Sequence, residues 1–155
     1  MTLQLTIQGL TEFQGDIANA VSSELPKQVK WAMVQSVNAV KNSAQGMVAY
    51  KTGTLRRSIF TDVSDTGFQG KVTQDSSVAP YGIYIEYGTA AHAINPVNAK
   101  ALFWPGAAHP VKRVMHPGTS ARPFMTPALE NNLDTITAYF SQAIKNVVLR
   151  MAGKA

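Results

Sequence analysis

Hydrophobic residues recur with helical spacing in two parts of the chain. The first stripe begins after Pro26 at spacings of three and four residues, as on one face of an α-helix. Its members are Val29, Met33, Val37, Val40, Ala44 and Met47. The second stripe covers about six turns and consists of Leu129, Leu133, Ile136, Phe140, Ala143, Val147 and Met151. The pattern predicts two long core helices, with a break or bend near Leu25 because Pro26 lacks a backbone N–H.

Shorter stretches carry strand signals. Leu3, Leu5 and Ile7 alternate with polar residues, which is the period of a half-buried strand. Residues 59–63 and 68–72 are rich in β-branched side chains and are separated by a Ser-Asp-Thr-Gly turn, so we expect a hairpin there.

The segment from Pro80 to Gly88 alternates like a strand but also fits a short helix. We expect the helix, since Pro80 suits a first helical turn and Gly88 suits a helix end. Residues 88–122 form a long irregular region, with residues 102–104 and 111–115 as short strand candidates. Loops of this length are commonly functional or become ordered against a partner.

The entry into the final helix is the clearest local signal. Residues 116–124 contain two prolines and a glycine, which prevent a regular helix. Thr126 can then cap a helix, with Pro127 at its first position and Glu130 in its first turn. Phe124 and Met125 would pack as an apolar plug between this helix and the sheet. These elements predict a single α+β domain over residues 1–155, in which a small, mostly antiparallel sheet packs against two long helices.

Positive charge is concentrated in two segments. Lys and Arg outnumber Asp and Glu by 14 to 9; residues 25–61 carry six bases and no acid, and residues 87–129 carry four bases and no acid. Such a surface can attract nucleic acid or an acidic partner, or can serve solubility alone. The candidate DNA-facing residues are Lys27, Lys30, Lys41, Arg56 and Arg57. We expect at most weak, non-specific contact with passing genomic DNA.

Several aromatic residues in or just before the second basic segment lie among apolar residues, not among bases: Tyr81, Tyr84, Tyr87, Phe103 and Trp104. This arrangement favours subunit contact over stacking on nucleotide bases. Apolar side chains on irregular backbone also need a partner surface to cover them. The candidate subunit-interface residues are Leu102, Phe103 and Trp104.

No pattern of catalytic chemistry is evident. The chain has no cysteine, and its three histidines with Glu86 match no metal-ligand spacing. Nucleophile elbows, P-loops and dinucleotide-binding glycine patterns are lacking as well. We therefore expect no enzyme activity, no cofactor and no metal. The first residues do not resemble a signal peptide, and no apolar run approaches the ~20 residues of a membrane span, so no membrane association is expected.

Three blocks in order resemble one family. KTGTLRRSI at 51–59, YGIYIEYGT at 81–89 and HPGTSARPFMTPALE at 116–130 are similar to the HK97 gp10-like family of tailed-phage and prophage tail-completion, or head-tail joining, proteins. The resemblance covers roughly residues 10–150 and departs from the family at Gly82, where a small side chain such as Ala is usual. The matching positions are Thr52, Gly53, Leu55, Ser58, Tyr84, Glu86, Tyr87, Gly88, Thr89, His116, Pro117, Gly118, Pro123, Phe124 and Pro127.

The resemblance implies a non-enzymatic structural protein whose motif residues are architectural. It implies a homo-oligomeric ring, expected as a hexamer, at the neck or upper tail of a virion and assembled in the host cytoplasm. Its partners would be further copies of itself, the tail tube protein and the head connector (stopper) protein. One alternative is a terminator ring that stops tail tube polymerisation. An alternative of another class is a basic nucleic-acid-binding protein.

Overall fold

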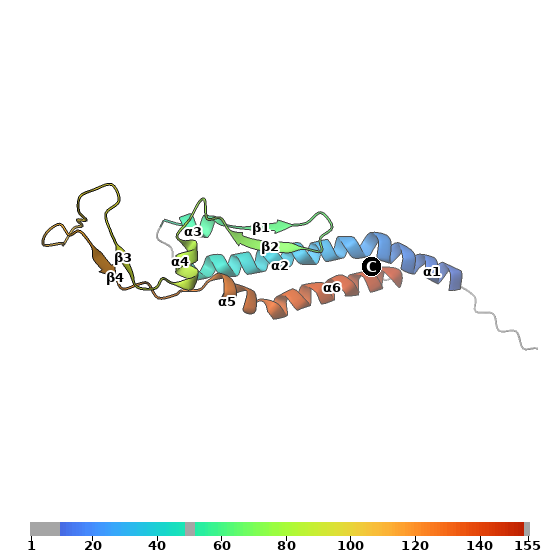
Figure 1. Cartoon of the computed structure of the whole chain (residues 1–155). Helices are drawn as coiled ribbons and strands as arrows, with labels where there is room; N and C mark the ends of the chain where they lie inside the picture. The colour runs from blue at the N-terminus through green and yellow to red at the C-terminus, as the bar shows by residue number, and fades with distance from the viewer. Residues whose placement is uncertain (1–9, 49–51, 154–155) are drawn as a thin grey trace, which may run out of the picture.

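Helix α2 (Leu25–Met47) packs against more of the other elements than any other element does in the computed structural model of the protein. Helix α6 (Leu133–Met151) lies along it, and the antiparallel hairpin of β1 (Ile59–Val63) and β2 (Gly70–Gln74) lies along another side (Figure 1). The predicted α+β class, with two long helices, is confirmed.

A continuous helical run precedes the first predicted stripe. Helix α1 (Leu10–Asn19) leads through a π-helical turn, η1 (Ala20–Glu24), directly into α2. The expected break near Leu25 takes the form of this π turn, in which the Leu25 N–H donates to the Ala20 carbonyl. A π turn changes which carbonyl each backbone N–H bonds. The helix can therefore continue through Pro26, which has no N–H to donate.

The second predicted helix is two helices. A short helix α5 (Met125–Glu130) is followed by α6, and Asn132 holds the N-cap position of α6. The prediction that Thr126 caps the helix and Pro127 opens it was wrong, because the helix already begins at Met125. Phe124 occupies the N-cap position without a side-chain cap bond, since its side chain carries no oxygen.

The strands differ from the predictions in their bounds and in how they are grouped into sheets. Strand β2 begins two residues later than predicted, because residues 64–69 form the turn, where Gly67 has φ 76°. In place of the single small sheet that we expected, the described residues form two two-stranded sheets. The second joins β3 (His92–Ile94) to β4 (Val114–His116), whereas residues 102–104 contribute only one isolated bridge, between Leu102 and Val111.

Two short helices complete the architecture. Helix α4 (Gly82–Tyr87) confirms the helical prediction for this segment, and α3 (Thr54–Arg57) is a single turn that we did not predict. The main core lies at the C-terminal end of α2, where α3, α4 and α5 meet. Its buried residues are Val40, Ala44, Leu55, Ile59, Ala79, Phe124 and Ala128.

The structure describes residues 10–48 and 52–153. The strand predicted at residues 3–7 and Lys51 lie outside these ranges. Within them, no helix is long and apolar enough to cross a membrane.

Candidate functional site: an arm, its anchor and an apolar groove

Glu86 of α4 caps helix α5 from a distance in sequence. Its Oε2 accepts the N–H groups of Phe124 at 2.7 Å and Met125 at 2.9 Å. Its Oε1 accepts both the N–H and the hydroxyl of Thr126, each at 3.1 Å. A helix N-terminus leaves its first N–H groups without intrahelical partners and favours negative charge. Glu86 therefore supplies the cap that Phe124 cannot.

The surroundings of Glu86 set its ionisation. Burial alone would raise the pKa of this carboxyl, but the hydrogen bonds from the start of α5 outweigh it, and the pKa lies below the ordinary 4.5. The side chain is 6% exposed, and its oxygens are satisfied by donors. Glu86 thus acts as a structural anion at the start of α5.

Residues 89–122, here called the arm, leave the body beside this cap. At its base Thr89 and Thr119 exchange backbone hydrogen bonds of 2.9 and 3.1 Å. Gly88 and Gly118 flank this pair with φ of 72° and 90°. A Cβ at Gly118 would lie 2.2 Å from the Thr89 carbonyl oxygen, and one at Gly88 would lie 2.5 Å from the Thr119 carbonyl oxygen. Both positions therefore need glycine for conformation and for space.

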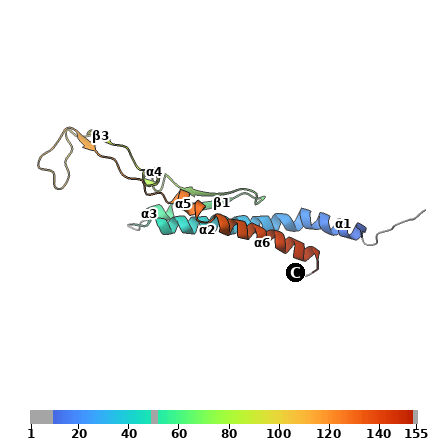
Figure 2. The same ribbon diagram turned by 90° about the horizontal axis from the view of Figure 1, so that it is seen from below.

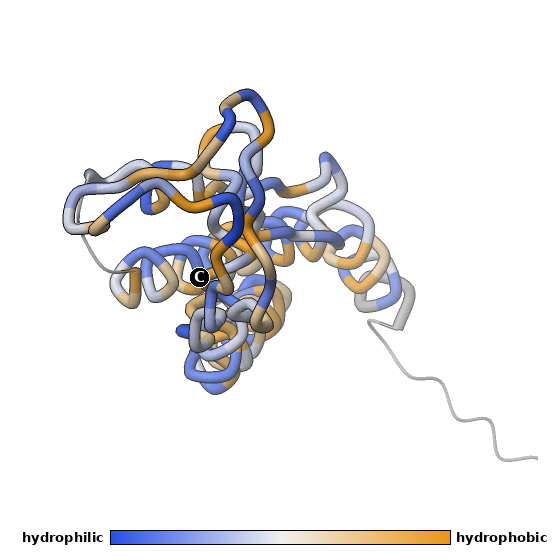
Figure 3. Tube along the Cα trace, turned by 60° about the vertical axis from the view of Figure 1, so that its left-hand side comes forward, coloured by the Kyte–Doolittle hydropathy of each residue, from blue (hydrophilic) through white to orange (hydrophobic). Residues whose placement is uncertain are grey.

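The arm projects from the end of the helical body opposite α1 (Figures 1 and 2). Hydrophobic and hydrophilic stretches alternate along it (Figure 3). Phe103 is 67% exposed and Trp104 is 44% exposed, whereas Leu102 is half-buried in its bridge to Val111. The structure thus places the three candidate interface residues together on a surface extension, with two aromatic side chains accessible.

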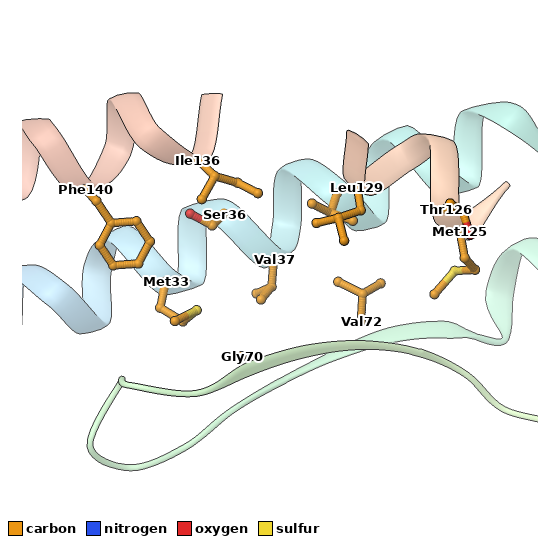
Figure 4. Close-up of a pocket in the computed structure, with 11 residues that line it drawn as sticks. Met33, Ser36, Val37, Gly70, Val72, Met125, Thr126, Leu129, Ile136 and Phe140 are labelled. Atoms are coloured by element: carbon orange, nitrogen blue, oxygen red, sulfur yellow. The ribbon is translucent and has the colours of Figure 1, made fainter. Parts of the chain in front are cut away.

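An apolar groove of about 430 Å³ lies between the hairpin and the C-terminal helices (Figure 4). Helix α2 forms its floor with Met33, Val37 and Val40. Strand β2 forms one wall, and α5 and α6 form the other. The wall residues are Gly70, Val72, Met125, Thr126, Leu129, Ile136 and Phe140. Ser36 also lines the groove, but its hydroxyl donates to the Ala32 carbonyl at 2.7 Å, so the lining is apolar in effect.

The first motif block is structural. Gly53 holds the N-cap position of α3 with φ 74°, and Leu55 is buried in the core. Ser58, the C-cap residue of α3, is 2% exposed and donates its hydroxyl to the Leu55 carbonyl. Thr52 is exposed, and its carbonyl accepts from the Arg57 guanidinium.

The other two blocks are only partly architectural. In the third block, the His116 Nδ1 accepts the Gly118 N–H at 3.0 Å, and Phe124 is 2% exposed. The prolines of this block are more exposed: Pro117 and Pro123 lie at the surface, and Pro127 is half-buried. In the second, Tyr84 and Tyr87 are 57% and 74% exposed. Most of the surface of both side chains is therefore accessible in one copy.

The candidate DNA-facing residues are spread along α2 and α3. Lys27 and Lys41 are 14 residues apart on α2, or about 21 Å at the rise of a helix. Lys27 pairs with Glu24 at 3.0 Å, and Lys30 donates to the Asp65 carbonyl at 3.2 Å. Lys41 donates to the amide of its neighbour Asn38, whereas Arg56 and Arg57 lie on α3 at the end of the hairpin. They do not gather into one basic patch.

The histidines separate into a pair and a single residue. His92 and His116 face each other across β3 and β4, with ring centroids 5.1 Å apart. His109 lies elsewhere on the arm. In the part of the chain that the structure describes, no group of three or more His, Asp or Glu side chains is placed to hold a metal ion.

The cap of Glu86, strand β3 and the groove were not foreseen from the sequence. No local signal revealed the cap, because Thr126 offered a plausible cap within the same stretch of sequence. No protein-family model, curated protein or solved structure matches the chain, so the likeness of the three blocks to a family remains a proposal.

Proposed function

We propose that the protein is a non-enzymatic structural component of a tailed-phage or prophage particle, which forms a ring that completes the tail and joins it to the head. The observation that carries this proposal is a rigidly anchored arm with exposed aromatic side chains, on a body that also has an open apolar groove. Both are surfaces that a protein normally covers with a partner. The three sequence blocks supply the phage context.

The separation of these surfaces favours a ring. The arm leaves one end of the body, while the groove runs along its side (Figures 1 and 4). When a copy contacts the next through two different surfaces, the interface is heterologous, and repeated copies close into a ring if the rotation allows. The hexamer is the ring size that the family resemblance implies.

The anchor of the arm supports an assembly role. Glu86 accepts four hydrogen bonds from three residues of the α5 entry. The Arg122 N–H also donates to the Ile85 carbonyl at 2.8 Å, so both ends of the arm are tied to α4. A fixed arm presents Phe103 and Trp104 in one direction, which suits a repeated contact of defined geometry.

Deleting the gene from a phage that carries it tests the proposal. The joining role predicts DNA-filled heads and separate tails of normal length. Abnormally long tails would instead support the terminator role. Infectious particles of normal yield and morphology would refute both roles, and complementation with the intact gene controls for polar effects on neighbouring genes.

A further inference from the structure

Strand β2 has one open edge, which borders the groove. Among the described residues its only strand neighbour is β1. In an antiparallel pair, alternate residues direct their N–H and C=O toward the partner strand. The hydrogen bond from the Ser64 N–H to the Gln69 carbonyl fixes this alternation. Gly70 and Val72 therefore direct their backbone groups away from β1, toward the open edge.

The same two residues also line the groove. A strand that added to this edge would satisfy their backbone groups, and every second side chain of that strand would enter the apolar space between β2 and α6. The groove thus requires an occupant of a particular kind: an extended segment with apolar residues at alternate positions and polar residues between them.

This pattern occurs at the start of the chain. Leu3, Leu5 and Ile7 alternate with Thr2, Gln4, Thr6 and Gln8. We propose that residues 2–8 of one copy add as a third strand to the open edge of β2 in a neighbouring copy, with their apolar side chains in its groove. This inference rests on the proposed ring and identifies the contact that links successive copies.

The length of the chain decides between the same copy and a neighbour. Met33, at the groove, follows Leu10 by 23 residues, because 33 minus 10 is 23. At 1.5 Å per helical residue this places it about 35 Å from Leu10. An extended chain spans at most about 3.6 Å per residue, so Leu3 can lie no more than about 25 Å from Leu10. The segment therefore cannot reach its own groove and must enter that of another copy.

Disulfide trapping tests the contact, because the chain has no cysteine of its own. Thr73 is exposed and alternates with Val72, so its side chain faces away from the groove. Oxidation of the full-length Gln4→Cys/Thr73→Cys and Thr6→Cys/Thr73→Cys variants should give a ladder of linked copies on non-reducing gels. The matched control places the second cysteine at Asp62 of β1, one strand further away and beyond the ~7 Å reach of a disulfide.

A charge substitution provides an independent readout. Leu5→Lys places an ammonium in the groove, whereas Thr6→Lys places it on the solvent face. Light scattering should show that Leu5→Lys raises the concentration for half-assembly by at least about tenfold, with little change for Thr6→Lys.

Three outcomes would overturn the inference. Rings that neither form the disulfide nor respond to Leu5→Lys would refute the strand exchange and leave the proposed ring intact. Cross-linking within a single chain would contradict the reach calculated from the helix. A chain that remains monomeric at every concentration would overturn the exchange and the ring together, while the deletion phenotype would still report on the tail.

Discussion

Replacing Glu86 with glutamine tests whether the remote cap holds the arm to the body. The substitution conserves shape but turns one carboxylate oxygen into an NH₂ group. Each oxygen of Glu86 accepts two hydrogen bonds from the α5 entry. In either orientation of the amide, two donors lose their acceptor, and the negative charge at the helix N-terminus is also lost.

The expected loss of stability follows from these contacts. A buried donor left without a partner costs about 1–3 kcal/mol, so two donors give roughly 2–4 kcal/mol if one finds partial compensation. For a chain of this size that corresponds to a fall of about 4–16 °C in Tm. Thermal and urea unfolding at pH 7, followed by circular dichroism, would measure it. The matched control is Glu130→Gln, which removes one exposed carboxylate from α5, the helix that Glu86 caps.

The pH dependence of stability provides a second test of the cap. Because the pKa of folded Glu86 lies below the ordinary 4.5, its contribution is fully present above about pH 4.5 and is lost as the pH falls through the lowered value. The stability difference between the native protein and Glu86→Gln should therefore shrink below pH 4.5. Equal stability at neutral pH, or a difference that persists undiminished in acid, would refute the capping role.

Three further predictions concern the core, the arm and nucleic acid. Phe124→Ala should lower the free energy of unfolding by about 3–5 kcal/mol, whereas Phe103→Ala, at an exposed position, should change it by less than about 0.5 kcal/mol in chemical unfolding. Gly118→Ala should speed backbone hydrogen exchange at the arm base more than Gly106→Ala does. Gly106 also has a positive φ, but a Cβ added there would have no neighbouring atom within 4 Å. Duplex DNA binding, measured by fluorescence anisotropy, should be weak and disappear as salt rises; a sequence-specific site that survives physiological salt would contradict this.

The parts of the fold that could be predicted depend on local chemistry. The stripe from Val29 to Ala44 predicted α2 because helical periodicity can be recognised within one segment, and Val29, Val37, Val40 and Ala44 are indeed buried. Helix α4 was predicted from Pro80 and Gly88 by the same kind of local signal. In the second stripe Ala143 and Val147 are buried, but Leu129 and Leu133, on either side of the interruption at Asn131 and Asn132, are about half exposed. Leu129 lines the open groove.

The parts that could not be predicted depend on contacts distant in sequence. Strand β3 pairs with a segment 20 to 24 residues away, and His92 at its start carries no strong strand preference. Glu86 and the groups that it caps are separated by 38 to 40 residues. The groove is formed by α2, β2, α5 and α6 together, so no single stretch of sequence encodes it.

In the proposed ring, the anchor and the proposed exchanged strand would have different tasks. A strand added to an open edge supplies affinity through backbone hydrogen bonds, but a flexible connection would allow many angles between neighbouring copies. Closure instead requires a fixed rotation from each copy to the next. The arm can set this angle because Glu86 and the glycines at its base hold it to the body. Loosening the anchor should therefore yield open or variable oligomers, whereas removing the strand contact should yield free monomers.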